Sequence, residues 1–239
     1  MRRARVAGTF LIPLLPAAAQ PALPDIGRPD APLSAAVQIV LWLTLLTLLP
    51  AIIMCITPFL RITLVLHFLR QALGTQTAPS NQLLLGMALF FTVLLMQPTA
   101  REMYTRGWEP YQQGKLTGSA AWEQGVQPLR RYLLRFAREK DIALLLEAGK
   151  RQPPARPDDL GLEILIPAYI LSELKAGFQI GAVLFLPFLV IDLVVASVTL
   201  SMGMIQLPPV MVSAPFKILL FVLVDGWSLV VGSLLKSVT

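Results

Sequence analysis

The residues best suited to chemistry lie in the apolar C-terminal third of the chain, where Ser172 and Lys175 stand three positions apart. On a helix this spacing places both side chains on one face, as a serine nucleophile with a lysine base would require. The sequence indicates no oxyanion-binding group, and Lys175 is equally suited to an ion pair. An intramembrane serine protease is therefore an alternative hypothesis, and we expect that the chain is not an enzyme.

Several charged residues interrupt the same apolar region. Glu173 and Lys175 are two positions apart, so on a helix they point to different faces and each needs a partner elsewhere. One interpretation is a buried pair with another subunit, and the other is proton handling. We favour the structural role because no histidine or second carboxylate lies nearby. Five charges are expected to be buried and to act in assembly or gating, namely Glu173, Lys175, Asp192, Lys217 and Asp225.

A turn predicted at Gly203–Pro209 separates Asp192 from Lys217. A turn centred near Met204 would place these two residues opposite each other on one hairpin. A lone charge at such a depth is costly and a pair is much less so. We therefore predict that Asp192 and Lys217 are partners.

Metal and disulfide chemistry have little support in the sequence. His67 is the only histidine and Cys55 the only cysteine among the 239 residues. These counts exclude multi-histidine metal sites and an intrachain disulfide. No metal or other cofactor is expected.

The composition is that of a membrane protein. Hydrophobic residues make up 55% of the chain and charged residues 14%, with a mean hydropathy of +0.67, whereas soluble domains carry about 25% charged residues. The net charge is +6, but the basic residues of the middle region are mixed with acids, which is typical of a solvated face. Contact with membrane lipid is expected and nucleic-acid binding is not.

The N-terminus has the three parts of a secretory signal. Arginines at positions 2, 3 and 5 precede a short apolar run and the small residues Ala17 and Ala19. We predict a signal peptide over residues 1–19 with cleavage after Ala19. Prolines then indicate an extended linker over residues 20–34.

Two apolar segments follow, and together they predict an N-terminal helical hairpin over residues 35–98. The first segment is uncharged from Ala31 to Leu60 and is long enough to span a bilayer. The second, Leu83–Met96, is shorter. Between them, Arg61–Gln82 contains basic residues and no acid, so it is predicted to be a cytoplasmic loop.

Residues 99–160 are then predicted to be a periplasmic helical insertion, since the loop before the second segment is placed in the cytoplasm. Leu129, Tyr132, Leu133 and Phe136 recur with helical spacing and indicate an amphipathic helix. From residue 161 to 239 the chain is apolar again but carries charges and five prolines, which predict kinked or broken helical hairpins. The expected fold is all-α and membrane-associated. A transporter and an assembled pore both remain open at this point.

Three stretches resemble the signatures of the FliP/SctR family of type III export-gate proteins. The first is Phe68–Gln76 with Pro79–Gln82 and Gly86–Phe90. The second runs from Ile166 to Ser197, with Ser172–Gly181 and Phe185–Asp192 at its centre. The third comprises Leu207–Met211, Pro215–Lys217 and Leu223–Trp227.

The resemblance implies a subunit of the flagellar protein export gate. Several copies would assemble with FliQ and FliR, beside FlhB and FlhA, into a pore for unfolded flagellar subunits in the bacterial inner membrane. A virulence type III secretion gate subunit is the alternative within the family. A small-molecule or ion transporter is the alternative of a different class.

The resemblance also implies a methionine-rich gasket at the pore constriction. The residues concerned are Met202, Met204, Ile205, Gln206 and Met211. Where the family has three successive methionines, this sequence has Met204-Ile205-Gln206. We expect Met204 and Ile205 to form the seal, with Gln206 away from the axis, because a ring of amides would hold water.

Overall fold

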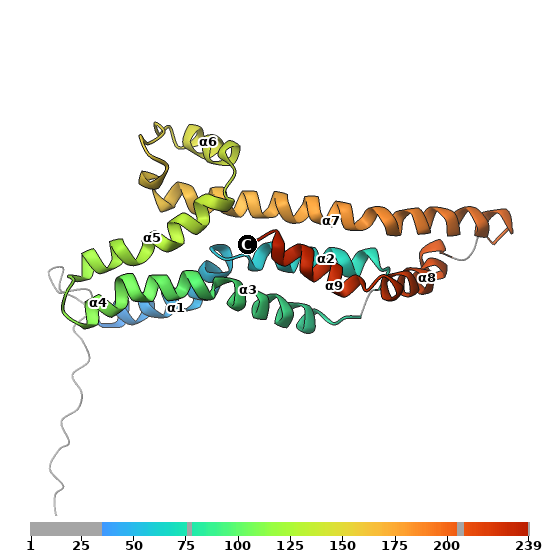
Figure 1. Cartoon of the computed structure of the whole chain (residues 1–239), viewed down its shortest axis with the longest axis horizontal. Coiled ribbons are helices and arrows are strands. Elements are labelled where there is room, and N and C mark those ends of the chain that lie inside the picture. The colour runs from blue at the N-terminus through green and yellow to red at the C-terminus, as the bar shows by residue number, and fades with distance from the viewer. Residues whose placement is uncertain (1–34, 76–77, 205–207, 239) are drawn as a thin grey trace, which may run out of the picture. The chain divides into compact units, whose positions relative to one another are not determined.

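The computed structural model describes residues 35–75, 78–204 and 208–238, and every regular element within these ranges is helical (Figure 1). The expected all-α class is confirmed. The predicted signal peptide with Ala17 and Ala19, and the linker over residues 20–34, lie outside the described residues. So do Ile205 and Gln206.

The first helix, α1 (Ala35–Cys55), lies mostly in a unit that ends at Leu48, and it is described here by itself. Its described side chains as far as Met54 are exposed, Trp42 to 70%, and it contains no charged residue. It continues through Pro50 and ends before Pro58, which precedes the next helix. Its 21 residues satisfy the ~20 that a bilayer span requires.

The second unit, Leu49–Thr239, is organised around α2 (Phe59–Ala72). Ile62, Val65 and Leu66 are fully buried, and one core contains these residues together with side chains from α3, α7, α8 and α9. Figure 1 shows α2 lying between α7 and α3. The prediction that Arg61–Gln82 is a loop is therefore wrong over most of its length. The apolar spacing of a helix is present there, and Arg61 is buried because α7 supplies its counter-charge.

The second apolar segment is also longer than expected. The helix α3 (Asn81–Met103) is capped by the Ser80 hydroxyl, which accepts a hydrogen bond from the Leu83 amide at 3.3 Å. It continues through Pro98, a π-helical turn (Tyr104–Trp108) and α4 (Glu109–Gln112), giving a helical run long and apolar enough to span. The expected boundary at residue 98 thus falls inside a helix.

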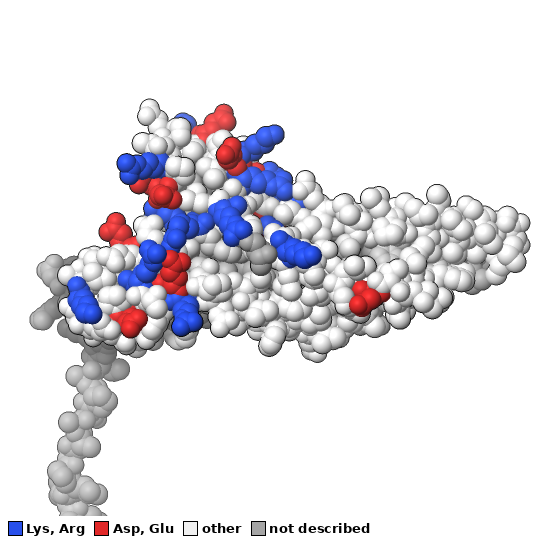
Figure 2. All heavy atoms as spheres, in the orientation of Figure 1, with Lys and Arg blue, Asp and Glu red and all other residues white. Residues whose placement is uncertain are grey.

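The predicted amphipathic helix is confirmed as α5 (Gly118–Phe136). Leu129 and Leu133 are buried, and they join a second core with residues of α6 (Glu139–Ala148) and the start of α7. A short 3₁₀ turn (Pro157–Asp159) leads into α7. In Figure 2 the charged side chains gather over α4, α5, α6 and the beginning of α7, whereas the surface over the rest of α7 and over α8 is nearly free of charge.

The longest element is α7 (Leu162–Ser201), with 40 residues, or about 60 Å at 1.5 Å per residue. Its prolines, Pro167 and Pro187, lie inside the helix without ending it, and the predicted broken helix is found further along the chain. A break in apolar surroundings would leave several backbone groups unsatisfied, whereas a proline within the helix removes one hydrogen bond. The break occurs instead between α8 (Pro209–Leu223) and α9 (Gly226–Lys236), which are bent by 69°.

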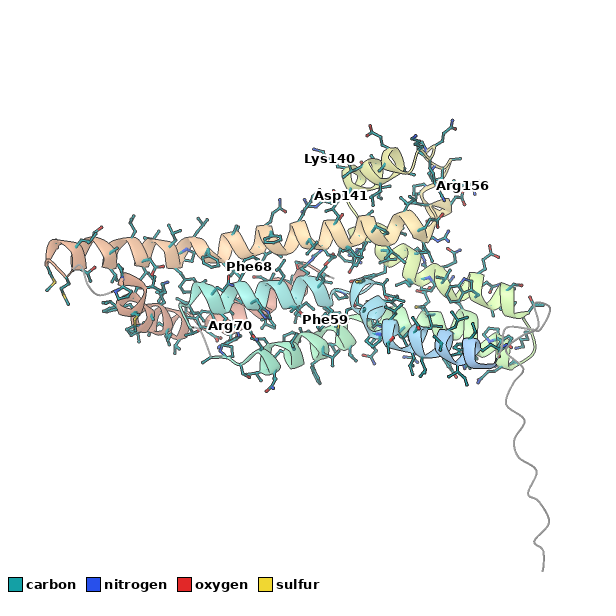
Figure 3. The ribbon with its side chains drawn as sticks, turned by 180° about the vertical axis from the view of Figure 1, so that it is seen from behind. Phe59, Phe68, Arg70, Lys140, Asp141 and Arg156 are labelled. Atoms are coloured by element: carbon teal, nitrogen blue, oxygen red, sulfur yellow. The ribbon has the colours of Figure 1, made fainter. Side chains whose placement is uncertain are left out.

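Two glycines of α7 allow its close approach to α2. A Cβ atom at Gly181 would lie 2.3 Å from Cδ2 of Phe68, and one at Gly177 would lie 2.7 Å from Cδ2 of Leu64. Phe68 lies between the two helices (Figure 3) and packs against Phe178 and Phe185. This is the small-xxx-small packing common between membrane helices.

We therefore expect Gly181→Ala to lower the stability of the detergent-solubilised chain by about 1–3 kcal/mol, because the added methyl group overpacks the contact. Gly86→Ala on α3 is the matched control, since a Cβ there meets nothing within 4 Å, and it should leave stability unchanged or slightly raised. Thermal unfolding of both variants is the measurement. Equal effects would show that α2 and α7 are not in close contact at Gly181.

Candidate functional site

The end of α7 places two methionines at an exposed turn. Gly203, with φ +73°, donates its amide to the Leu200 carbonyl, and Met204 donates to the Thr199 carbonyl. This pair of bonds is the Schellman arrangement, in which the residue after the cap takes a left-handed conformation that suits glycine. Met202 is 68% exposed and Met204 40%.

An apolar hollow lies beside this turn. It has a volume of about 550 Å³ and is lined by α7, the turn and α8, with side chains that include Val194, Val198, Met202, Met204 and Phe216. Met211, in the first turn of α8, is 73% exposed. The described methionines of the expected gasket therefore belong to one hairpin, and a single chain leaves them uncovered.

The same hairpin is held by the predicted ion pair. Lys217 Nζ lies 2.6 Å from Asp192 Oδ2, and the Ser213 hydroxyl donates to Asp192 Oδ1 at 2.5 Å. The Lys217 side chain is 3% exposed and that of Asp192 34%. The expectation that Asp192 and Lys217 are partners is confirmed.

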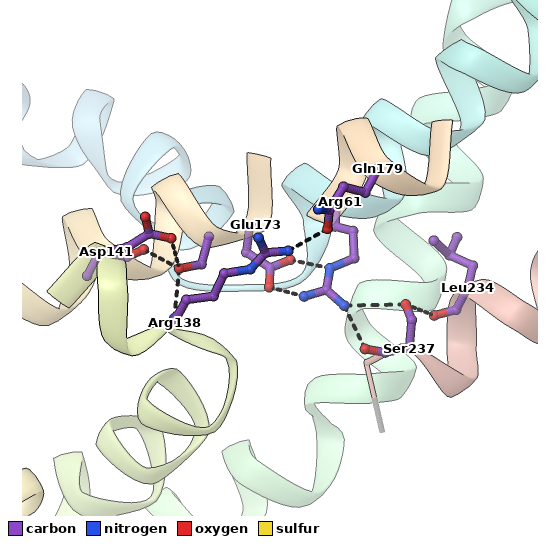
Figure 4. Close-up of polar contacts among 9 residues, drawn as sticks. Arg61, Arg138, Asp141, Glu173, Gln179, Leu234 and Ser237 are labelled. Carbon is purple, nitrogen blue, oxygen red and sulfur yellow. Dashed lines mark hydrogen bonds and ion pairs between the residues drawn. The ribbon is translucent and has the colours of Figure 1, made fainter. Parts of the chain in front are cut away.

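Glu173 is fully buried, and its partner is Arg61 of the same chain (Figure 4). Arg61 donates from Nε to Glu173 Oε2 at 2.8 Å and from Nη2 to Oε1 at 2.5 Å. Its Nη1 donates to the Ser237 carbonyl at 2.6 Å, and the guanidinium lies over the Phe136 ring at 5.6 Å from the centroid. The pair thus joins α2 and α7 to the C-terminal residues, and the expected partner from another subunit is not required.

Lys175 also has its partner within the chain. Its ammonium group binds Asp141 of α6, a buried carboxylate that also accepts a hydrogen bond from Ser172 Oγ at 2.8 Å. Burial raises the pKa of Asp141, but the hydrogen bonds from Lys175 and Ser172 and the charges of Lys175 and Arg138 outweigh it, so that the pKa lies below the usual value. Figure 3 shows Asp141 on the side of α6 that faces α7.

This arrangement does not support the serine protease hypothesis. Ser172 is 1% exposed, and its hydroxyl lies at hydrogen-bond distance from Asp141 and from the Ala168 carbonyl. It also accepts a hydrogen bond from the Arg138 amide at 2.9 Å. Both members of the supposed dyad bind Asp141, so the lysine is not placed to activate the serine.

The expectation that all five charges are buried is wrong for three of them. Glu173 and Lys217 are buried, whereas Asp192 is half-buried and Lys175 and Asp225 are exposed. Among the described residues, no group of three or more histidines, cysteines or carboxylates is placed to hold a metal.

Sequence reasoning missed Arg61 and Asp141 as partners. Arg61 was assigned to a loop although apolar residues on both sides of it recur with helical spacing, namely Phe59, Ile62, Leu66 and Leu69. Asp141 lies 34 positions from Lys175 in the amphipathic region, and no local signal connects the two.

Comparison with known proteins places the chain in one family. A sequence model of the FliP family matches residues 42–234, which include the Arg61–Glu173 and Asp192–Lys217 pairs and the α7–α8 turn. The chain belongs to the FliP family. The chain is 46% identical to the flagellar biosynthetic protein FliP of Bacillus subtilis over 204 residues, which cover 85% of this chain and 92% of that protein.

Two further relatives carry the same name. The FliP protein of Pectobacterium carotovorum is 46% identical over 84% of this chain and 78% of its own length. The FliP protein of Borreliella burgdorferi is 41% identical over 84% of this chain and 81% of its own length. Membership of this family and the apolar helices identify the chain as a membrane component of the flagellar protein export apparatus.

Proposed function

We propose that the chain is a pore-forming subunit of the flagellar export gate, which assembles as several copies with FliQ and FliR, beside FlhB and FlhA, and passes unfolded flagellar subunits. The observation that carries the proposal is the exposed methionine turn at the end of α7, on a hairpin held by the ion pair of half-buried Asp192 with buried Lys217. A flexible apolar ring at this turn could exclude water when idle and deform around a passing chain.

The exposed apolar surface supports assembly. Val190, Leu193 and Val194 on α7 are each more than half exposed, as are Leu219 and Val222 on α8. These faces lie beside a half-buried carboxylate, Asp192, which lipid would not solvate. Protein neighbours would cover such a surface at lower cost. In this proposal the chain has a structural role and no catalytic one, and the charged region over α5 and α6 lies in the periplasm.

The decisive biochemical test is co-purification. Extraction in mild detergent from cells that also produce FliQ and FliR should yield one complex with more than one copy of this chain. Recovery with virulence-type secretion subunits in preference to the flagellar ones would favour the alternative branch of the family. Recovery as a single copy under all these conditions would contradict the pore.

The gasket proposal predicts a leak. Replacing Met204 and Ile205 with alanine should leave assembly intact but increase the ion permeability of the cell membrane, because a wider ring no longer dewets. Ion flux in cells that produce the variant measures this. Met54→Ala is the matched control, since Met54 is a 41% exposed methionine of α1. Unchanged ion permeability in the alanine variant would exclude this turn as the gate. So would cysteines at the turn that never cross-link to a stalled export substrate.

A further inference from the structure

Asp225 is a carboxylate without a partner on an apolar surface. It is exposed, it directly precedes α9, and its side chain caps no amide of that helix. Among the described residues, none donates a hydrogen bond to its carboxylate or forms an ion pair with it. Its neighbours Val222, Leu223 and Val224 are 67%, 73% and 49% exposed.

An unpaired carboxylate on an apolar surface is unfavourable both in lipid and in a dry protein interface. Lipid cannot solvate a carboxylate, and an apolar neighbour that covered it would leave a buried, unpaired charge. The backbone of Asp225 is left-handed, with φ +49°. An aspartate in this conformation usually forms a local side-chain hydrogen bond, and Asp225 caps no amide of α9. The surface around Asp225 therefore fits a neighbour that is apolar and carries one cation.

The same chain has such a surface around Arg70. Arg70 is half-buried in the last turn of α2, and its Nη1 donates to the Asn81 side-chain oxygen at 2.5 Å and to the Pro79 carbonyl at 3.4 Å. Both acceptors are neutral, and no other guanidinium nitrogen donates to a described residue. Nε and Nη2 are therefore available for a two-point bond to a carboxylate. Leu83 and Leu85, which follow Asn81 on α3, are 56% and 42% exposed.

Three other charged pairs on and beside the helices around α2 form within the chain. Arg61 pairs with Glu173, Lys217 with Asp192 and Lys175 with Asp141. Arg70, by contrast, binds only neutral oxygens among the described residues, and Asp225 binds no described side chain. Their charges are complementary.

Arg70 and Asp225 lie toward opposite ends of α8. Gly74, one turn beyond Arg70, lies near Val210 and Ala214 at the beginning of α8, whereas Asp225 follows its end. Fifteen residues of helix extend about 22 Å. The two charges are thus on separate parts of the surface, as a head-to-tail contact between identical chains requires.

We infer that the Asp225 surface binds a second copy of this chain, with the Asp225 carboxylate on the Arg70 guanidinium of the neighbour. The apolar side chains around each charge exclude water from the pair. The inference rests on the proposed multi-copy gate and specifies one of its contacts.

Charge reversal tests the contact. In complexes extracted with the partner subunits, Asp225→Arg and Arg70→Glu should each reduce the multi-copy form at least tenfold by native mass spectrometry. The double variant should recover it to within about threefold of wild type. Glu147→Arg is the matched control, because it makes the same change of charge at an exposed position of α6, and it should assemble normally. Thermal unfolding of each variant separates lost assembly from lost folding.

Cross-linking provides the second readout. In a Cys55→Ser background, one copy carries Arg70→Cys and a differently tagged copy carries Asp225→Cys. A disulfide that joins the two tags supports the contact. A double variant no better than the singles, or an Asp225→Cys that links to FliQ or FliR instead, overturns it. Asp225→Arg complexes of wild-type copy number would overturn this contact alone, whereas a wild-type chain found only as a single copy would overturn the proposed pore as well.

Discussion

Glu173→Gln should destabilise the chain by about 3–5 kcal/mol, the cost typical of removing one partner from a buried ion pair. Glutamine has nearly the same shape, but it removes the negative charge and presents an amide N–H group to the guanidinium. Arg61, whose side chain is 7% exposed, would then be a buried cation without a counter-charge. Thermal unfolding in detergent is the measurement.

The loss should extend to the C-terminus, because Arg61 also holds the Ser237 carbonyl at 2.6 Å. Residues after α9 should become accessible to carboxypeptidase in the variant. Combining Glu173→Leu with Arg61→Met should recover part of the stability, since removing both charges avoids the unpaired one. Arg61→Lys should not recover it, because an ammonium group cannot form the two-point bond to Glu173.

The exposed pair of Glu163 with Arg151 is the control. Its Oε1–Nη1 distance is also 2.5 Å, but both side chains are more than half exposed, and exposed pairs contribute about 0–1 kcal/mol. Glu163→Gln should therefore have little effect. Similar losses in Glu163→Gln and Glu173→Gln would mean that burial does not determine the importance of the inner pair.

Neutralising the Asp192–Lys217 pair should have an asymmetric effect. Asp192→Asn leaves the ammonium of Lys217, whose side chain is 3% exposed, without a counter-charge, and should cost about 3–5 kcal/mol. Lys217→Met should cost less, because Asp192 is 34% exposed and keeps its bond from Ser213. Thermal unfolding and the yield of assembled complex both report the difference.

Exchanging the two charges should be less damaging than Asp192→Asn, since the pair is restored with opposite polarity. Asp225→Asn is the control for stability, because its carboxylate has no described partner within the chain. That variant should unfold as wild type does. An exchange that performs no better than Asp192→Asn would show that the pair does not stabilise the α7–α8 hairpin.

Much of the local structure could be predicted because it depends on nearby residues. The apolar period of residues 129–136 predicted the buried face of α5, and Gly203 together with the prolines at 208 and 209 predicted the turn after α7. The Asp192–Lys217 pair followed from this turn, since a tight hairpin places equidistant residues opposite each other. Family membership was likewise readable from rare residues in a fixed order.

The partners of Glu173 and Lys175 could be decided only by the tertiary structure. Glu173 binds Arg61, 112 positions away, and Lys175 binds Asp141, 34 positions away. No repeating pattern in the sequence connects residues that are 112 or 34 positions apart, and Arg61 in isolation is typical of a solvated loop. Burial of α2 became favourable because α7 supplies both a counter-charge and, at Gly177 and Gly181, the space for close packing. Composition and period determine which segments form helices, whereas the pairing of charges between helices depends on the packing of the whole chain.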